Sequence, residues 1–165
     1  MADLPSEFRG HVDVPAPIED VYALLADVPD STRHFPDLER VVRHEGGYLW
    51  TVKKAGVGRL SAQMIYACRY TSDDAARTVR SDAIEGAGNT TVYGSWRLEE
   101  RGGRTRLNLH NKLVMHLDIP RLMVRAARPV VDQISGRLMG QYLENLKQTF
   151  SGGDGRVSAH ALQLD

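Results

Sequence analysis

The chain has 165 residues, 42% of them hydrophobic and 25% charged, which suits one globular domain with a substantial core. Its 21 basic residues balance 21 acidic ones, so no overall field favours nucleic acid or an anionic membrane surface as partner. The single cysteine, Cys68, excludes an internal disulfide and a multi-cysteine metal site. The sequence shows no secretory signal and no apolar run long enough to span a membrane. We therefore expect a cytoplasmic protein without an integral membrane segment.

The first quarter of the chain predicts a strand followed by two short helices. Residues 8–14 alternate between apolar and polar side chains, as a half-buried strand does. Residues 18–26 place their apolar side chains on one helical face. Pro29 is expected to end this helix, and Asp30 or Ser31 to cap a second short one.

Six further strands follow in succession. Each candidate segment is rich in β-branched or aromatic residues, and glycine or Ser-Asp-Asp turns separate them. Short connections of this kind join antiparallel neighbours. The expected strands are 39–44, 48–54, 60–70, 77–84, 90–99 and 105–115.

Residues 120–150 predict one long helix with an apolar face. The apolar residues recur in steps of three and four: Met123, Ala127, Val130, Val131, Ile134, Leu138, Tyr142, Leu146 and Phe150. Pro129 removes one helical hydrogen bond, so we expect a kink or break near Ala127, with residues 120–127 as a candidate gate. Gly136 and Gly140, one turn apart, indicate either tight packing against the sheet or a second subunit, or room for a ligand.

These elements predict an α+β helix-grip fold. A seven-stranded curved antiparallel sheet would wrap around the long C-terminal helix, with two short helices between the first and second strands. Residues 1–150 form the single expected domain. Residues 151–165 begin with Ser-Gly-Gly-Asp-Gly and are expected to be a flexible tail.

Three motifs resemble those of the START/Bet v 1-like superfamily, also called SRPBCC. They are VDVPAPIEDVYALLAD at 12–27, HFPDLERV at 34–41 and YGSW at 93–96. Within the superfamily, the chain is similar to the polyketide cyclase/dehydrase and coenzyme Q-binding branch. The resemblance covers residues 6–150 and implies a cavity between the sheet and the long helix. It leaves the ligand open, because members include lipid and sterol carriers, cyclases, aromatases and hormone receptors.

Strand alternation and the helical face together nominate the residues that line this space. The alternatives are a filled core and a ligand-lined cavity; the resemblance favours the cavity. The candidate ligand-binding residues are Trp50, Met64, Tyr66, Trp96, Leu107, Leu109, Asn111, Leu113, Met123, Ala127, Val131, Ile134 and Leu138.

Few of the polar residues suggest chemistry. Asn111 is an amide on an otherwise apolar strand face, so it needs a partner from the protein, from water or from a ligand. Cys68 lies in an apolar stretch and is expected to behave as a small buried hydrophobe. His110 and His116 share a strand face but lie about 20 Å apart, too far to share a metal ion. No catalytic pair, metal or other cofactor is expected.

A basic bias is confined to one stretch of the chain. Residues 97–128 contain eight arginines and lysines but only three acidic residues, Glu99, Glu100 and Asp118. This stretch forms either an ordinary solvated surface or a patch that steers anions.

The expected function is binding or carriage of a hydrophobic small molecule, such as a quinone, a lipid or a polyketide-like aromatic. One alternative is a polyketide cyclase or aromatase that uses the same cavity to bend a chain and polarise a carbonyl. A second alternative is a stress-related interaction protein with a filled cavity. The expected partner is the hydrophobic ligand rather than nucleic acid, and the chain is compatible with a monomer or a homodimer.

Overall fold

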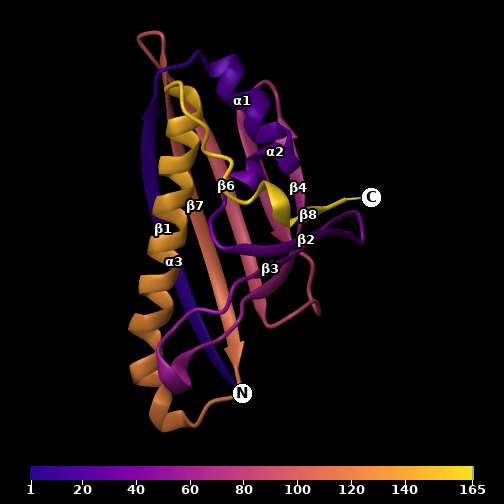
Figure 1. Ribbon diagram of the computed structural model, residues 1–165, viewed down its shortest axis with the longest axis vertical. Coiled ribbons are helices and arrows are strands. Elements are labelled where there is room, and N and C mark those ends of the chain that lie inside the picture. The colour runs from indigo at the N-terminus through magenta and orange to yellow at the C-terminus, as the bar shows by residue number, and fades with distance from the viewer. Residues whose placement is uncertain (165) are drawn as a thin grey trace.

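The computed structural model describes residues 1–164 as an α+β helix-grip fold, as the sequence predicts (Figure 1). The three α-helices are α1 (Ile18–Ala26), α2 (Val28–Arg33) and α3 (Arg121–Phe150), with 3-10 turns η1 (Gly58–Leu60) and η2 (Ala159–Ala161). The eight strands are β1 (Ala2–Val14), β2 (Leu38–His44), β3 (Gly47–Val52), β4 (Ile65–Asp73), β5 (Thr78–Ala83), β6 (Thr90–Arg101), β7 (Arg104–Leu117) and β8 (Leu162–Gln163).

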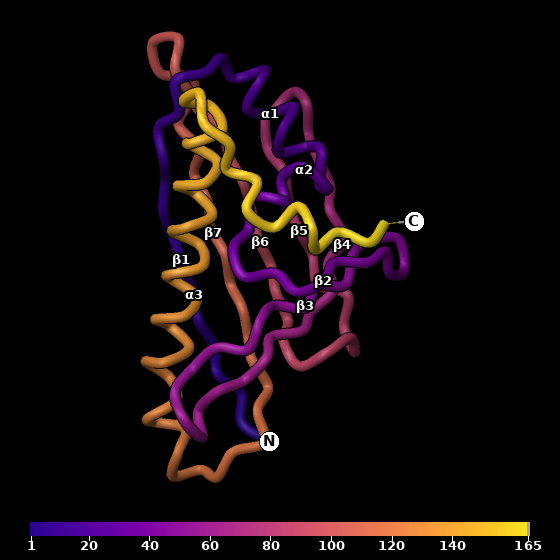
Figure 2. The backbone as a smooth tube through the Cα atoms, in the orientation of Figure 1, coloured from indigo at the N-terminus to yellow at the C-terminus, as the bar shows by residue number. Residues whose placement is uncertain are grey.

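One curved sheet contains all the strands, in the order β1-β7-β6-β5-β4-β3-β2-β8. Neighbouring strands from β1 to β2 are antiparallel, as the short connections require. The sheet curls around α3, which runs beside β1 and β7 along the long axis of the molecule (Figures 1 and 2). Strand β7 buries alternate residues against the helix, among them Leu107, Leu109, Asn111, Leu113 and Met115. The predicted inward face of this strand is therefore confirmed.

The two short helices close one end of the space inside the sheet. Asp27 caps α2 by accepting the backbone N–H of Asp30 at 3.2 Å, and Pro29 lies in the first turn. The expectation that Pro29 ends α1 and that Asp30 or Ser31 caps α2 is wrong. Proline lacks a backbone N–H, which makes it suited to a first helical turn, where that N–H would have no partner.

Helix α3 continues through Pro129, which the sequence predicts to kink or break it. Pro129 and Arg125 are both exposed, so water can satisfy the Arg125 carbonyl that loses its helical partner. Gly136 and Gly140 leave open space where a side chain would stand, so neither packs tightly against the sheet. The helix is thus continuous from the expected gate, residues 120–127, to Phe150.

The connection between β3 and β4 is longer than expected, because β4 begins at Ile65 rather than near Leu60. Residues 53–62 leave the sheet as a loop that an isolated bridge between Ala55 and Ala62 holds together. The loop contains η1 and a glycine at position 56 with a φ of 120°, a conformation that excludes a β-carbon. It lies across the N-terminal half of α3 (Figure 1).

The expected flexible tail is instead packed on the domain as a C-terminal strap, residues 151–164. Leu162 pairs with Val41 in parallel, so β8 adds an eighth strand to the sheet. Ala161 is fully buried, and a β-carbon at Gly155 would overlap the backbone oxygen of Asn145. The glycines that suggest flexibility therefore allow the strap to lie close to α3.

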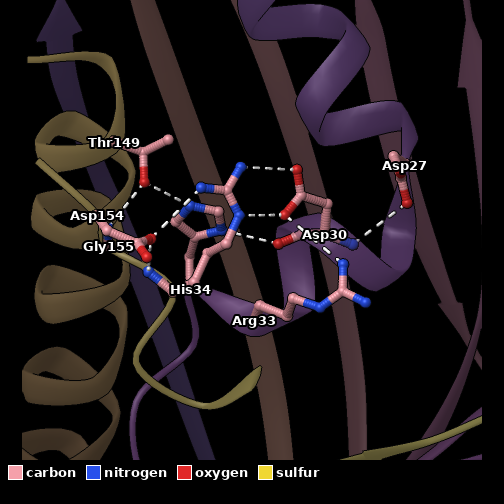
Figure 3. A network of polar contacts seen from close by, with 8 residues as sticks. Asp27, Asp30, Arg33, His34, Thr149, Asp154 and Gly155 are labelled. Carbon is pink, nitrogen blue, oxygen red and sulfur yellow. Dashed lines mark hydrogen bonds and ion pairs between the residues drawn. The ribbon is translucent and has the colours of Figure 1, made fainter. Parts of the chain in front are cut away.

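A polar network fastens the strap to α2 and α3 (Figure 3). Arg156 donates to both carboxylate oxygens of Asp30, at 2.7 and 3.1 Å. Buried His34 contacts the Asp30 carbonyl through Nδ1 and the Thr149 hydroxyl through Nε2, both at 2.8 Å. A carbonyl only accepts, so Nδ1 carries the proton and Nε2 accepts from Thr149, which in turn accepts from the Gly155 N–H at 2.9 Å.

Candidate ligand-binding cavity

The space between the sheet and α3 contains two adjoining cavities. The inner cavity, of about 50 Å³, has no charged side chain in its lining. The outer cavity, of about 220 Å³, reaches the surface beside the exposed side chains of Lys53, Arg59 and Asp118. Both cavities touch the same four side chains: Met64, Leu113, Ser135 and Leu138. The two cavities therefore adjoin, and their combined volume approaches the low end, about 300 Å³, of small-molecule sites.

Aromatic rings form one wall of the inner cavity. Trp50 and Tyr66 are stacked, with centroids 5.5 Å apart and an interplanar angle of 19°. The ring centroid of Tyr70 lies 6.5 Å from that of Trp50 and 6.2 Å from that of Trp96. Phe35 meets Trp50 edge to face at 5.6 Å. Such a wall offers flat apolar surface with fixed geometry to a planar ligand.

A short hydrogen-bonded chain crosses the same cavity. Trp96 Nε1 donates to the Tyr142 hydroxyl at 3.1 Å, and this hydroxyl lies 2.6 Å from Ser31 Oγ. Gly94 makes room for the Trp96 ring, because a β-carbon at this position would lie 3.2 Å from two ring atoms. Helix α2, strand β6 and helix α3 are thereby joined across the cavity, and the polar groups of this chain satisfy one another.

Two other polar groups in the cavity walls have no such partner. Trp50 Nε1 and Ser135 Oγ are buried and make no hydrogen bond to any residue from 1 to 164. Asn111 also lines the inner cavity, and its side chain is buried. An unpartnered buried polar group costs about 1–3 kcal/mol, so the positions of Trp50 Nε1 and Ser135 Oγ favour a polar atom of a bound molecule.

None of the shifted ionisable groups in the inner wall charges near neutral pH. Burial raises the pKa values of Tyr66 and Tyr70 well above the ordinary 10, and that of Tyr142 to about 12. Burial also raises the pKa of the Cys68 thiol to about 12, and the thiol donates to the carbonyl of Val92 at 3.4 Å. The groups thus act as neutral hydrogen-bond donors and acceptors and not as a thiolate nucleophile or a ready base.

The structure brings most of the predicted lining residues to the two cavities. Those at the inner cavity are Trp50, Met64, Tyr66, Trp96, Leu109, Asn111, Leu113 and Leu138. Ala127, Val131 and Ile134 line the outer cavity. Leu107 is fully buried and Met123 half-buried, and neither lines either cavity. Leu107 lies near the start of β7, two residues before Leu109, the first residue of the strand that lines either cavity. Met123 lies in the first turn of α3, before the helix reaches the outer cavity.

Other lining residues are absent from the sequence prediction. Ser31 and Phe35 reach the inner cavity from α2 and the turn after it, where too few residues exist for a periodic pattern. Ser135 lies three residues before Leu138 and therefore on the same helical face, so its spacing could have nominated it. Lys53 and Arg59 come from the loop, which has no alternation to indicate which way its side chains point.

Neither a metal centre nor a membrane span is found in the described part of the chain. Among residues 1–164, no three His, Cys, Asp or Glu side chains gather closely enough to hold a metal ion. His110 Nε2 lies 2.6 Å from a carboxylate oxygen of Glu7, and His116 Nδ1 lies 2.8 Å from one of Asp3. These are two separate contacts between β1 and β7. No helix within these residues combines the length and the apolar character needed to cross a membrane.

Comparison with known proteins places this geometry in a family. The sequence profile of the family described as polyketide cyclase/dehydrase and lipid transport matches residues 6–151. The chain belongs to this family. The description covers both cyclases and lipid transport, so membership alone does not choose between an enzyme and a carrier.

Solved structures of low sequence identity share the fold. The Zhui aromatase/cyclase from a Streptomyces species has a TM-score of 0.68 and 21% identity, covering 89% of this chain and 94% of its own. A START superfamily protein from Mycobacterium smegmatis has a TM-score of 0.61 and 14% identity, covering 88% and 97%. No curated protein sequence matches the chain closely enough to give a more specific function. At these identities, the likeness establishes the helix-grip fold alone.

Proposed function

We propose that this protein binds and carries a flat, largely apolar small molecule with carbonyl or hydroxyl groups, such as a quinone or an aromatic polyketide. The stacked pair of Trp50 and Tyr66 supports a planar ligand in the inner cavity. The larger outer cavity, between the loop and α3, would hold an aliphatic extension of the ligand. The two cavities adjoin at Met64 and Leu138, so one elongated molecule would occupy both.

The observation that carries this proposal is the pair of unpartnered polar groups, Trp50 Nε1 and Ser135 Oγ. Both line the inner cavity, one from the sheet and one from α3. Two oxygen atoms of a ligand, accepting from the indole N–H and from the hydroxyl, would satisfy both groups at once. A purely hydrocarbon ligand would leave them unsatisfied, at a cost of about 1–3 kcal/mol each.

The alternative function is that of a cyclase or aromatase. Tyr66, Tyr70 and Asn111 line one cavity and could polarise a carbonyl of a bent poly-β-ketone chain. The likeness to the Zhui aromatase/cyclase keeps this alternative open. Against it, no His, Asp, Glu or Lys among residues 1–164 lines the inner cavity, so no side chain in its wall is a ready base near neutral pH. We therefore prefer a carrier. The outer cavity of about 220 Å³ argues against the third candidate, an interaction protein with a filled interior.

A titration with a naphthoquinone probe, followed by tryptophan fluorescence, tests the carrier. Replacing Trp50 with phenylalanine keeps a flat ring and removes the unpartnered N–H, so we expect the probe to bind about tenfold more weakly. Trp96→Phe is the matched control, because Trp96 Nε1 already donates to Tyr142 and is not available to a ligand. Native mass spectrometry of the protein purified from its source should show the natural ligand as added mass. Equal probe affinity in the Trp50→Phe variant and the wild type would refute the assigned contact.

The cyclase alternative has its own test. An enzyme would change the products that a poly-β-ketone thioester forms spontaneously, and Tyr66→Phe or Asn111→Leu would abolish this change. A product distribution identical to the spontaneous one leaves the carrier as the function. A distribution that depends on Tyr66 and Asn111 would establish the enzyme instead.

A further inference from the structure

Exposed aliphatic side chains gather at the end of the molecule where the outer cavity reaches the surface. Leu122, Met1 and Val57 are 94%, 89% and 76% exposed, the three largest fractions among the large hydrophobic residues. Ala2 pairs with Leu117 at the end of β7, which brings the N-terminus close to the start of α3. The loop that carries Val57 crosses α3 at this same end (Figures 1 and 2).

The same end carries more cations than acids. Six exposed basic residues lie in the two segments that flank the outer cavity, 53–62 and 117–128: Lys53, Lys54, Arg59, Arg121, Arg125 and Arg128. Asp118 is the single acid in these segments, and none of the six cations forms an ion pair with any residue from 1 to 164. We call the six cations together with Met1, Val57 and Leu122 the mouth surface.

The basic stretch noted in the sequence therefore divides into two parts. In the part before α3, Arg97 and Arg101 pair with Glu99 and Arg106 pairs with Asp13, so most of its cations are compensated. The part on α3 is uncompensated, although the whole chain carries no net charge. At physiological salt, charges more than about 8 Å apart are largely screened from each other. A molecule in contact with the mouth surface therefore experiences the local excess of positive charge rather than the zero net charge of the chain.

The start of α3 adds to the excess positive charge. Its first turn contains Arg121 and no acidic residue, although the N-terminus of a helix favours negative charge. The arrangement is unfavourable for the free helix, and a nearby anion relieves it. An exposed leucine next to this arginine, at position 122, adds an apolar contact at the same point.

We propose that the mouth surface docks on an anionic lipid bilayer. Val57 and Leu122 insert among the lipid headgroups, and the surrounding cations contact lipid phosphates while their aliphatic stems lie along the apolar boundary. Two separate aliphatic side chains, on segments that also carry six exposed cations, suit a fluid interface better than a rigid protein partner, which would need a matching pocket for each. Docked in this way, the outer cavity opens toward the membrane. Exchange of a hydrophobic ligand there rests on the proposed function, but the docking itself does not.

Sedimentation of the full chain with vesicles tests the docking. We expect binding to phosphatidylcholine vesicles containing about one-third phosphatidylglycerol, and little to phosphatidylcholine alone, with affinity falling as salt rises. Neutralising Arg121 and Arg125 together as Arg121→Gln/Arg125→Gln should weaken binding about 30-fold. Leu122→Ser should weaken it about tenfold. All these positions are exposed, and thermal unfolding of each variant checks that it is folded.

Matched controls come from elsewhere on the surface. Arg97→Gln/Arg104→Gln removes the same charge near the other end of β7, and Val157→Ser removes an exposed aliphatic side chain from the strap; both should bind vesicles as the wild type does. Equal losses in the controls and the mouth variants would mean that binding is unspecific and would overturn the proposal. So would equal binding to neutral and anionic vesicles, or no binding to either. Binding to an acidic protein without binding to vesicles would replace the lipid with a protein partner and would also overturn it.

The naphthoquinone titration, run without vesicles, separates this proposal from the proposed function. Leu122 does not line either cavity, so Leu122→Ser should bind the probe with wild-type affinity. Vesicle binding without probe binding would leave the docking standing and the carrier rejected. Probe binding without vesicle binding would leave the carrier and reject the docking.

Discussion

Ser31 and Ser135 line the same inner cavity but differ in their hydrogen bonding. Ser31 Oγ lies 2.6 Å from the Tyr142 hydroxyl, whereas Ser135 Oγ has no partner among the described residues. Ser135→Ala should therefore stabilise the free protein by about 1 kcal/mol, because it removes an unsatisfied buried hydroxyl and places a better helix former in α3. Ser31→Ala should destabilise it by about 1 kcal/mol, since the Tyr142 hydroxyl loses one of its two partners and keeps only Trp96 Nε1.

Urea unfolding measures both changes, as opposite shifts of the midpoint at an unchanged slope. The naphthoquinone titration then separates stability from binding, because Ser135→Ala should bind the probe more weakly although it is the more stable protein. Loss of stability in Ser135→Ala would mean that its hydroxyl has a partner after all, and would remove one of the two contacts assigned to the ligand.

At the scale of single elements, Gly136 and Gly140 test what lies against the outer face of α3. A β-carbon at either position meets no atom within 4 Å, so nothing in the chain requires glycine there. Gly136→Ala and Gly140→Ala should each stabilise the protein by about 1 kcal/mol, which raises the melting temperature by about 2–4 °C. Gly94→Ala is the contrasting variant, because its β-carbon would lie 2.8 Å from Ser81 Oγ and should destabilise the protein. Destabilisation by the helix variants, with loss of a dimer on gel filtration, would reveal a subunit interface at these glycines.

The strap is the element whose stability depends most directly on pH. Burial lowers the pKa of His34 below its ordinary 6.5, because removal from water penalises the charged ring, and the contact with the Asp30 carbonyl only partly opposes this. The unfolded chain then binds more protons, so stability is full above about pH 6.5 and falls as the pH drops toward the folded pKa, by up to about 1.4 kcal/mol per unit. Arg156 lowers the pKa of Asp30, and that contribution is lost only at lower pH, below the ordinary 3.8.

Urea unfolding at about pH 7.5 and at about pH 5.5 measures the effect of His34. A His34→Gln variant should lose most of the difference in stability between the two pH values, whereas His160→Gln, at an exposed position, should keep it. An unchanged pH dependence in the His34→Gln variant would assign the effect to another group.

The elements themselves were largely predictable, because their patterns are local. Alternation along β7 and the three-and-four spacing of α3 located both elements to within a few residues. The failures came where distant contacts decide the conformation. The strap carries glycines that suggest a loose tail, but Gly155 is held against Asn145 and Leu162 against Val41. No local pattern contains such contacts.

The candidate site was predictable to the same extent, for the same reason. Eleven of the thirteen nominated residues line one of the two cavities, because a buried strand or helix face in this fold points to the interior. Residues of α2 were missed because a six-residue helix has too little periodicity to orient its side chains. The unpartnered state of Trp50 and Ser135 depends on what every neighbour bonds to, and only coordinates contain that information.

At the scale of the whole molecule, the two ends of α3 have opposite character. At its C-terminal end, Arg156 and His34 are paired in a network that ties α2, α3 and the strap together (Figure 3). At its N-terminal end, the mouth surface carries cations without ion pairs among the described residues, and the loop 53–62, which lies outside the sheet, covers the outer cavity. Exposed loops outside the sheet open locally at a lower cost than the core strands, so the mouth is where a ligand is expected to enter and leave.

Hydrogen exchange with and without the naphthoquinone probe tests this asymmetry. A ligand at about 100 times its Kd stabilises the folded protein by about 2.7 kcal/mol, and amides that open only locally show where it is in contact. Protection should rise in the loop 53–62 and in residues 127–138 of α3, which line the outer cavity from opposite sides. The strap, residues 151–164, should change little, because it lines neither cavity. The reverse result, with protection rising in the strap and α2 while the loop is unaffected, would place the route of exchange at the other end of α3. The cations of the mouth surface would then have no connection with the ligand.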